Sequence, residues 1–119
     1  MIGAIPFISW GLPFSPARNG KPWEVEVQVI ALGNEVAWVS LPGEIFVELG
    51  LAIKQASPFR YTMIAELANG SIGYIPDRPA YAQGNYEVVS ARCAEGSGEM
   101  LVKAAVRLLS GVTARGTRK

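Results

Sequence analysis

The chain has 119 residues, half of them hydrophobic and 18% charged, which is the composition of one globular domain with a single core. Its formal net charge is +1, so no strong electrostatic field would gather nucleic acid, and nucleic-acid binding is not expected. The chain contains no histidine, which excludes a self-contained Ser-His-Asp triad and any histidine-based metal site built by this chain alone.

Residues 1–23 begin with an apolar, uncharged run and continue as a loop rich in proline and glycine. Residues 1–14 lack the basic start and the small-residue cleavage site of a signal peptide, and prolines interrupt any helix that could span a membrane. We interpret residues 1–23 as the remnant of a larger domain, packed against another segment, or alternatively as a strip that binds a partner. At the other end, residues 112–119 are expected to form a basic, flexible tail.

Polar and apolar residues alternate in residues 24–32, which predicts a β-strand with one face in water. The pair Gly33-Asn34 tolerates positive φ and suits a tight turn, so residues 35–41 are predicted to return as the second strand of a hairpin. The segment 36–41 is a nearly unbroken apolar run. This run predicts a central strand that is buried on both faces.

The sequence Pro42-Gly43 ends that strand, and apolar residues then recur at helical spacing over residues 44–56. The spacing predicts a helix with Glu44 in its first turn. Residues 61–67 are predicted to form another strand. A strand, a helix and a strand in this order predict a right-handed βαβ crossover in which strands 36–41 and 61–67 run parallel.

A loop-rich stretch follows over residues 69–92, and long loops in compact domains are often functional. Ser97 can cap a helix over about residues 97–110, whose leucines and alanines form one apolar stripe. The single cysteine, Cys93, can form no internal disulfide, and we interpret it as a buried thiol. Residues 24–111 are therefore predicted to form an α/β domain with a small mixed sheet.

Candidate functional residues lie in the two loops that follow the parallel strands. Because ligands of parallel α/β sheets bind beyond the carboxyl ends of the strands, these loops are expected to meet at one edge of the sheet. The candidates are Glu44, Glu66, Asn69 and Tyr74. A structural role is open for each of them; for example, the helix dipole would stabilise Glu44 by about 0.3–1 kcal/mol.

The segment Leu41-Pro42-Gly43-Glu44 resembles the Pro-Gly-Glu segment of neutral/alkaline ceramidases. The later Gly73-Tyr74-Ile75-Pro76, followed by Tyr81 and by Asn85-Tyr86-Glu87, resembles a Tyr-Ile-Thr-Thr segment that is followed by Tyr and Arg-Tyr-Glu. The step from Tyr74 to Tyr86 also matches the spacing of that family. The resemblance covers roughly residues 24–111, which is a minor part of a complete ceramidase.

This resemblance implies an α/β catalytic domain that hydrolyses the amide of ceramide, with one zinc ion held by two histidines, one glutamate and one tyrosine. By position, Glu44 matches the glutamate ligand and Tyr74 the tyrosine ligand. Tyr86 matches a tyrosine near the scissile carbonyl, where a neutral hydroxyl can donate to the developing oxyanion. Further candidates for contacts with the substrate or support of the ligands are Glu66, Asn69 and Tyr81.

Two hypotheses follow from these patterns. In the first, the chain is a fragment of a zinc-dependent amide hydrolase that acts on an N-acyl lipid. Both histidine ligands would then come from the upstream part of the same enzyme, and the isolated chain is predicted to be inactive. In the second, the chain is a non-catalytic α/β module that binds a partner.

Overall fold

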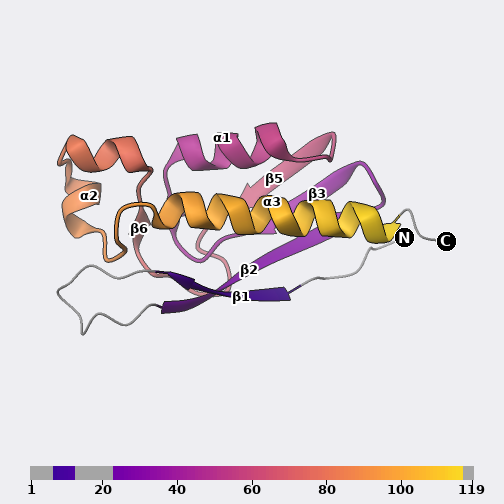
Figure 1. Ribbon diagram of the computed structural model, residues 1–119, viewed down its shortest axis with the longest axis horizontal. Helices are drawn as coiled ribbons and strands as arrows, with labels where there is room; N and C mark the ends of the chain where they lie inside the picture. Colours follow the sequence, from indigo (N-terminus) through magenta and orange to yellow (C-terminus); the bar gives the residue numbers. More distant parts are fainter. Residues whose placement is uncertain (1–6, 13–22, 117–119) are drawn as a thin grey trace.

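The computed structural model describes residues 7–12 and 23–116, which form a four-stranded mixed sheet with helices on one of its faces and a separate two-stranded ladder (Figure 1). The sheet has the strand order β1-β2-β3-β5, from β1 (Phe7–Leu12), β2 (Trp23–Leu32), β3 (Val36–Ser40) and β5 (Tyr61–Ala65). The two long helices, α1 (Val47–Ala56) and α3 (Ser97–Gly116), pack against the sheet and against each other. The shorter elements are β4 (Glu44–Ile45), β6 (Tyr74–Ile75), the 3-10 helix η1 (Arg78–Ala82) and α2 (Tyr86–Ser90).

The predicted hairpin is confirmed, because β2 and β3 pair antiparallel with Val29 opposite Val39 and Leu32 opposite Val36. Gly33 lies in the turn with φ 65°, a backbone conformation that glycine adopts without steric cost. The register places alternate residues of both strands on the helix side of the sheet. These inward positions form the sheet's share of the core.

The predicted βαβ crossover is also confirmed. Strand β5 pairs parallel with β3, with Trp38 opposite Met63, and α1 connects the two strands. The helix begins at Val47, however, and not at residue 44. The N–H of Glu44 donates to the Gly73 carbonyl oxygen at 2.9 Å, so Glu44 and Ile45 are held in a β ladder and not in a helical turn. The helix-dipole explanation of Glu44 is therefore wrong.

The core lies between the sheet and the two long helices. Its fully buried side chains include Val27, Val29, Ala37 and Val39 from the sheet, Ile53 from α1, and Leu101, Ala104, Ala105 and Leu109 from α3. On the opposite face of β3, Val36 and Trp38 are only half-buried, which corrects the prediction of burial on both faces. Among the described residues, no helix covers that face of the sheet (Figure 1).

Two ends of the domain differ from the prediction. Residues 7–12 form an edge strand that pairs antiparallel with β2, with Trp10 opposite Val25, whereas the sequence had indicated only an apolar segment. The C-terminal helix continues to Gly116, beyond the predicted end near residue 110, so residues 112–116 are helical and do not belong to the predicted flexible tail. The interpretations of residues 1–6, 13–22 and 117–119 lie outside the described residues. In the part of the chain that the structure covers, no helix combines the length and apolar character needed to cross a membrane.

Candidate active site beside strands β4 and β6

Glu44 and Tyr74 occupy opposite positions in the short parallel ladder of β4 and β6. The ladder is closed by hydrogen bonds from the Glu44 N–H to the Gly73 oxygen at 2.9 Å and from the Phe46 N–H to the Ile75 oxygen at 3.1 Å. Successive side chains of a strand alternate between two faces, so paired residues share a face. Ile75 on the inner face is fully buried, and the Glu44 carboxylate and the Tyr74 phenol therefore lie together on the outer face.

The negative charge of Glu44 acts on Tyr74. It is the largest cause of a Tyr74 pKa raised above the ordinary 10.0, and desolvation, Tyr86 and Glu87 contribute smaller increases. A carboxylate disfavours the phenolate because the two groups would both be negative. Tyr74 is consequently neutral at physiological pH in this chain, with its hydroxyl available as a hydrogen-bond donor.

Tyr86 is brought to the same place by α2, of which it is the first residue. Its ring meets the Tyr74 ring edge-on, with centroids 6.0 Å apart and an interplanar angle of 77°. Edge-to-face contacts of this kind are favourable because the positive ring edge meets the negative ring face. The Tyr86 side chain is nevertheless 71% exposed, so it can contact a bound molecule.

Gly43 allows the turn before Glu44 to lie directly against β6. A Cβ atom at this position would stand 2.7 Å from the Gly73 carbonyl oxygen and 2.6 Å from Cδ1 of Ile75. Both distances are shorter than non-bonded contacts tolerate, and one of the opposing atoms belongs to the backbone. The sequence had indicated Gly43 only as a strand terminator, and its requirement for close packing became visible only with β6 in place.

The loop after β5 is tied to the turn before Glu44 by three backbone hydrogen bonds. They join Leu67 N–H to the Gly43 oxygen (3.2 Å), Ala68 N–H to the Leu41 oxygen (3.0 Å) and Ile72 N–H to the Pro42 oxygen (2.7 Å). Leu67 adopts φ 54°, which a bulky side chain seldom tolerates without support. These bonds supply that support, and they fix the position of β4 relative to β6.

Glu66 supports β4 from the side opposite β6. Its Oε2 accepts a hydrogen bond from the Ile45 N–H at 3.0 Å. Because the N–H groups of Glu44 and Phe46 point to β6, the intervening Ile45 N–H points the other way, where Glu66 takes the place of a neighbouring strand. Glu66 therefore contacts the backbone next to Glu44 and is not part of the pair that Glu44 and Tyr74 form.

Asn69 and Tyr81 make structural contacts away from this pair. The Asn69 amide donates to Oε1 of Gln28 at 3.2 Å, and its φ of 60° is that of a turn residue. The Tyr81 hydroxyl donates to the Cys93 carbonyl oxygen at 2.9 Å, and burial raises the Tyr81 pKa to about 12. Cys93 itself is buried, which raises its thiol pKa to about 11 and leaves it unsuited to nucleophilic chemistry.

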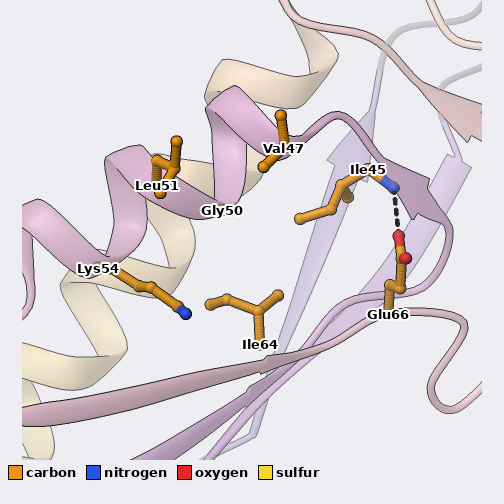
Figure 2. A pocket seen from close by; sticks show the side chains of 7 residues that line it. All are labelled: Ile45, Val47, Gly50, Leu51, Lys54, Ile64 and Glu66. Carbon is orange, nitrogen blue, oxygen red and sulfur yellow. Dashed lines mark hydrogen bonds between the residues drawn. The ribbon is translucent and has the colours of Figure 1, made fainter.

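A groove of about 240 Å³ lies on the other side of β4, between α1 and the end of β5 (Figure 2). Val47, Gly50, Leu51 and Lys54 of α1 form one wall, and Ile45, Ile64 and Glu66 line the rest. Ile45 lines this groove, and Glu44, the preceding residue of the strand, faces the other way. The groove and the pair of Glu44 and Tyr74 are therefore separate features. The sequence had given no sign of this groove.

The arrangement offers two oxygen donors, one carboxylate and one phenol, to a cation or to a polar substrate. Glu87 also acts electrostatically on Tyr74, and the sequence signal for it is its place beside Tyr86 in Asn85-Tyr86-Glu87. No group of three or more His, Cys, Asp or Glu side chains that could hold a metal ion occurs within residues 7–12 and 23–116.

Comparisons with known proteins give a structural likeness only. No protein-family model matches the sequence, and no curated protein matches it. Neutral ceramidase from Pseudomonas aeruginosa matches with a TM-score of 0.70 at 22% identity, over 79% of this chain and 16% of that chain. A ceramidase complexed with C2 matches with a TM-score of 0.69 at 21% identity, over 77% of this chain and 15% of the other. The chain thus has the fold of one part of a ceramidase and spans about a sixth of its length.

Proposed function

We propose that this chain supplies part of the active site of a zinc-dependent amide hydrolase, with Glu44 and Tyr74 as two of the metal ligands. The observation that carries the proposal is their direct pairing in the ladder of β4 and β6, which places both side chains on one face. The likeness in fold to a part of neutral ceramidase supports the reaction class. A catalytic zinc usually needs at least three protein ligands, so Glu44 and Tyr74 are too few, and the resemblance to ceramidases implies that two histidines from outside this chain complete the set.

The donor chemistry fits a divalent cation. Without a cation, Glu44 raises the pKa of Tyr74 because their negative charges would repel. A cation held by both residues would reverse this effect, since its positive charge would favour the carboxylate of Glu44 and the phenolate of Tyr74 alike. Zinc accepts carboxylate oxygen at about 2.0–2.2 Å and, when bound, supplies Lewis acidity toward an amide carbonyl.

We assign to Tyr86 a direct contact with the amide that is hydrolysed. Hydrolysis adds a water oxygen to the carbonyl carbon, breaks the C–N bond and gives a carboxylic acid and an amine. Negative charge develops on the carbonyl oxygen during the addition, and a neutral phenol can donate a hydrogen bond to it. The exposure of Tyr86 and the edge-on contact with Tyr74 support this role, because they leave the hydroxyl accessible next to the two proposed ligands.

The substrate that we propose is an N-acyl lipid of the ceramide type. The support is the likeness to two ceramidases, one of them solved as a complex with C2. The upstream part of the same enzyme is the proposed partner, since this chain has no histidine to contribute. The other candidate function, a non-catalytic module, is favoured by the apolar groove of Figure 2, whose lining includes neither Glu44 nor Tyr74.

Zinc content of the complete enzyme that contains this chain tests the proposal. Glu44→Ala and Tyr74→Phe should each lower the bound zinc and the rate of ceramide hydrolysis. Glu48→Ala is the matched control, because Glu48 is an exposed carboxylate on α1, and it should leave both unchanged. A Glu44→Ala enzyme with full zinc and full activity would show that the assignment is wrong. Chelator-sensitive ceramide hydrolysis by the 119-residue chain alone would show that no ligand is missing.

A further inference from the structure

Strand β5 is the last strand of the sheet in the described part of the chain, and one of its edges faces no other strand. The Tyr61 N–H donates to the Glu35 oxygen and the Ala65 oxygen accepts from the Leu41 N–H, both at 2.9 Å, so the odd-numbered residues of β5 bond to β3. Because hydrogen-bonding groups alternate along a strand, the N–H and C=O groups of Thr62 and Ile64 point to the free edge. Such an edge is a template for another strand.

Exposed apolar side chains gather on both sides of this edge. The described residues include eight exposed large hydrophobic side chains, and four of them flank β5: Val47 (67%), Leu51 (58%), Tyr61 (51%) and Met63 (42%). Val47 and Leu51 line the groove of Figure 2 together with Ile64. A second hollow, which includes Lys54, Tyr61 and Met63, continues along the start of β5. The apolar lining therefore follows the strand over its whole length.

The charges at the two ends of β5 are opposite in sign. Arg60 directly precedes the strand, and Glu66 directly follows it. Both residues are exposed. The Cζ atom of Arg60 lies 5.2 Å from the centroid of the Tyr61 ring. Glu66 accepts the hydrogen bond from the Ile45 N–H with Oε2. Met63 is midway between the two charged residues. An antiparallel copy of the same strand, with Met63 next to Met63, would therefore bring each arginine opposite a glutamate.

We propose that two copies of this chain pair through the free edges of β5, antiparallel, with the two-fold axis beside Met63. Thr62 of each copy then faces Ile64 of the other, and both belong to the set whose N–H and C=O groups point outward, so four backbone hydrogen bonds close the seam. Each Arg60 lies opposite Glu66 of the second copy, an arrangement of opposite charges that stabilises strand pairs. The result is a continuous eight-stranded sheet with a self-complementary interface.

The apolar residues follow the same symmetry. The α1 helices of both copies lie on the same face of the joined sheet, so Val47 and Leu51 of both copies approach the seam from that face. The Tyr61 and Met63 side chains of both copies gather on the opposite face. A second copy thus brings an apolar neighbour to each of the four exposed side chains that flank the edge, which an unrelated strand without this helix would not do. The inference does not depend on the proposed enzymatic function.

Sedimentation velocity over a concentration series of the 119-residue chain tests the pairing. We expect a monomer–dimer equilibrium. Arg60→Glu and Glu66→Arg should each raise the dimer dissociation constant about tenfold, because each change replaces two attractive contacts by two repulsive ones. The double variant, which exchanges the two charges, should restore the original constant. Arg92→Glu and Glu24→Arg are matched controls, since both residues are exposed and lie outside β5, and they should leave the dimer unchanged.

Amide hydrogen exchange identifies the seam independently. Protection of the Thr62 and Ile64 amides should rise with chain concentration, while the amides of β1 should keep a constant rate. A chain that stays monomeric at millimolar concentration would overturn the proposal. So would a dimer in which both single variants associate as the original chain does, or one that the double charge exchange fails to restore.

Discussion

Glu44 lies directly opposite Tyr74 in the parallel ladder of β4 and β6, and the carboxylate raises the pKa of the phenol. Neither residue reaches this position through a regular helix or a long strand. The turn at Gly43, the loop after β5 and the carboxylate of Glu66 hold β4 in place from three directions. The pair is therefore a property of the folded chain, and its electrostatic coupling can be measured without metal or substrate.

Glu44→Gln should lower the pKa of Tyr74 toward the ordinary value of 10.0, because the substitution keeps the shape of the side chain and removes its negative charge. Ultraviolet absorbance of tyrosinate during a pH titration measures the change, and Tyr74→Phe identifies the signal that belongs to Tyr74. Glu48→Gln is the control for the loss of one carboxylate, and it should leave the titration unchanged. An unchanged Tyr74 pKa in Glu44→Gln would mean that the two side chains are not neighbours in solution.

Gly43→Ala should destabilise the fold by about 1–3 kcal/mol, because the added Cβ meets a backbone oxygen at 2.7 Å and an isoleucine methyl at 2.6 Å. Urea unfolding followed by circular dichroism measures the loss. Gly111→Ala in α3 is the control, since its Cβ would meet no atom within 4 Å. That change should stabilise the helix by up to about 1 kcal/mol. Equal effects of the two substitutions would contradict the close approach of the turn to β6.

The longer elements could be predicted from the sequence because their patterns are local. The alternation of polar and apolar residues over 24–32 predicts strand β2, and Gly33 predicts the turn that follows it. The helical spacing of apolar residues predicts α1. The sequence places the start of α1 too early because a carboxylate such as Glu44 suits a first helical turn and Ile45 fits the apolar periodicity of the helix. Their strand pairing depends on β6, which lies far along the sequence, and a two-residue ladder leaves no periodic signal.

The candidate site was predictable in part. The rule that loops after parallel strands meet at one edge brought Glu44 and Tyr74 together correctly, and the spacing to Tyr86 came from the resemblance. The same rule also gathered Glu66 and Asn69, whose side chains instead bind Ile45 and Gln28. Sequence patterns fix which loop a residue lies in, but the side chain's direction depends on hydrogen bonds to distant segments. For the same reason, the partial exposure of Val36 and Trp38 on one face of β3 could not be predicted from the sequence.

The burial of the Tyr81 hydroxyl predicts a loss of stability in alkali. Burial raises the folded-state pKa of Tyr81 from 10.0 to about 12, so folding favours the protonated phenol. This contribution is complete below pH 10 and is lost as the pH rises toward 12. Cys93, whose pKa is raised from 9.0 to about 11, adds a loss of the same sign from pH 9 upward.

Tyr81→Phe separates the two contributions, because Cys93 is the same in both proteins. The variant should be less stable at neutral pH by about 0.5–1.5 kcal/mol, since the buried carbonyl loses its donor. Its stability should then fall less steeply than that of the original chain between pH 10 and 12. Chemical unfolding at a series of pH values measures both effects. Parallel pH profiles for the two proteins would show that Tyr81 titrates normally in the folded chain.

Tyr86→Phe distinguishes a hydroxyl that donates to the reacting amide from one that only supports the fold. The ring and its edge-on contact with Tyr74 remain in this variant, so the fold and the zinc content of the complete enzyme should not change. The turnover number should fall about 10²–10³-fold, as expected for loss of one oxyanion donor, while KM changes little. The control is Tyr61→Phe, which removes an exposed hydroxyl from β5 and should leave turnover unchanged. A lower zinc content in Tyr86→Phe would instead indicate that Tyr86 helps to hold the metal ligands, and turnover equal to that of the original enzyme would remove Tyr86 from the reaction.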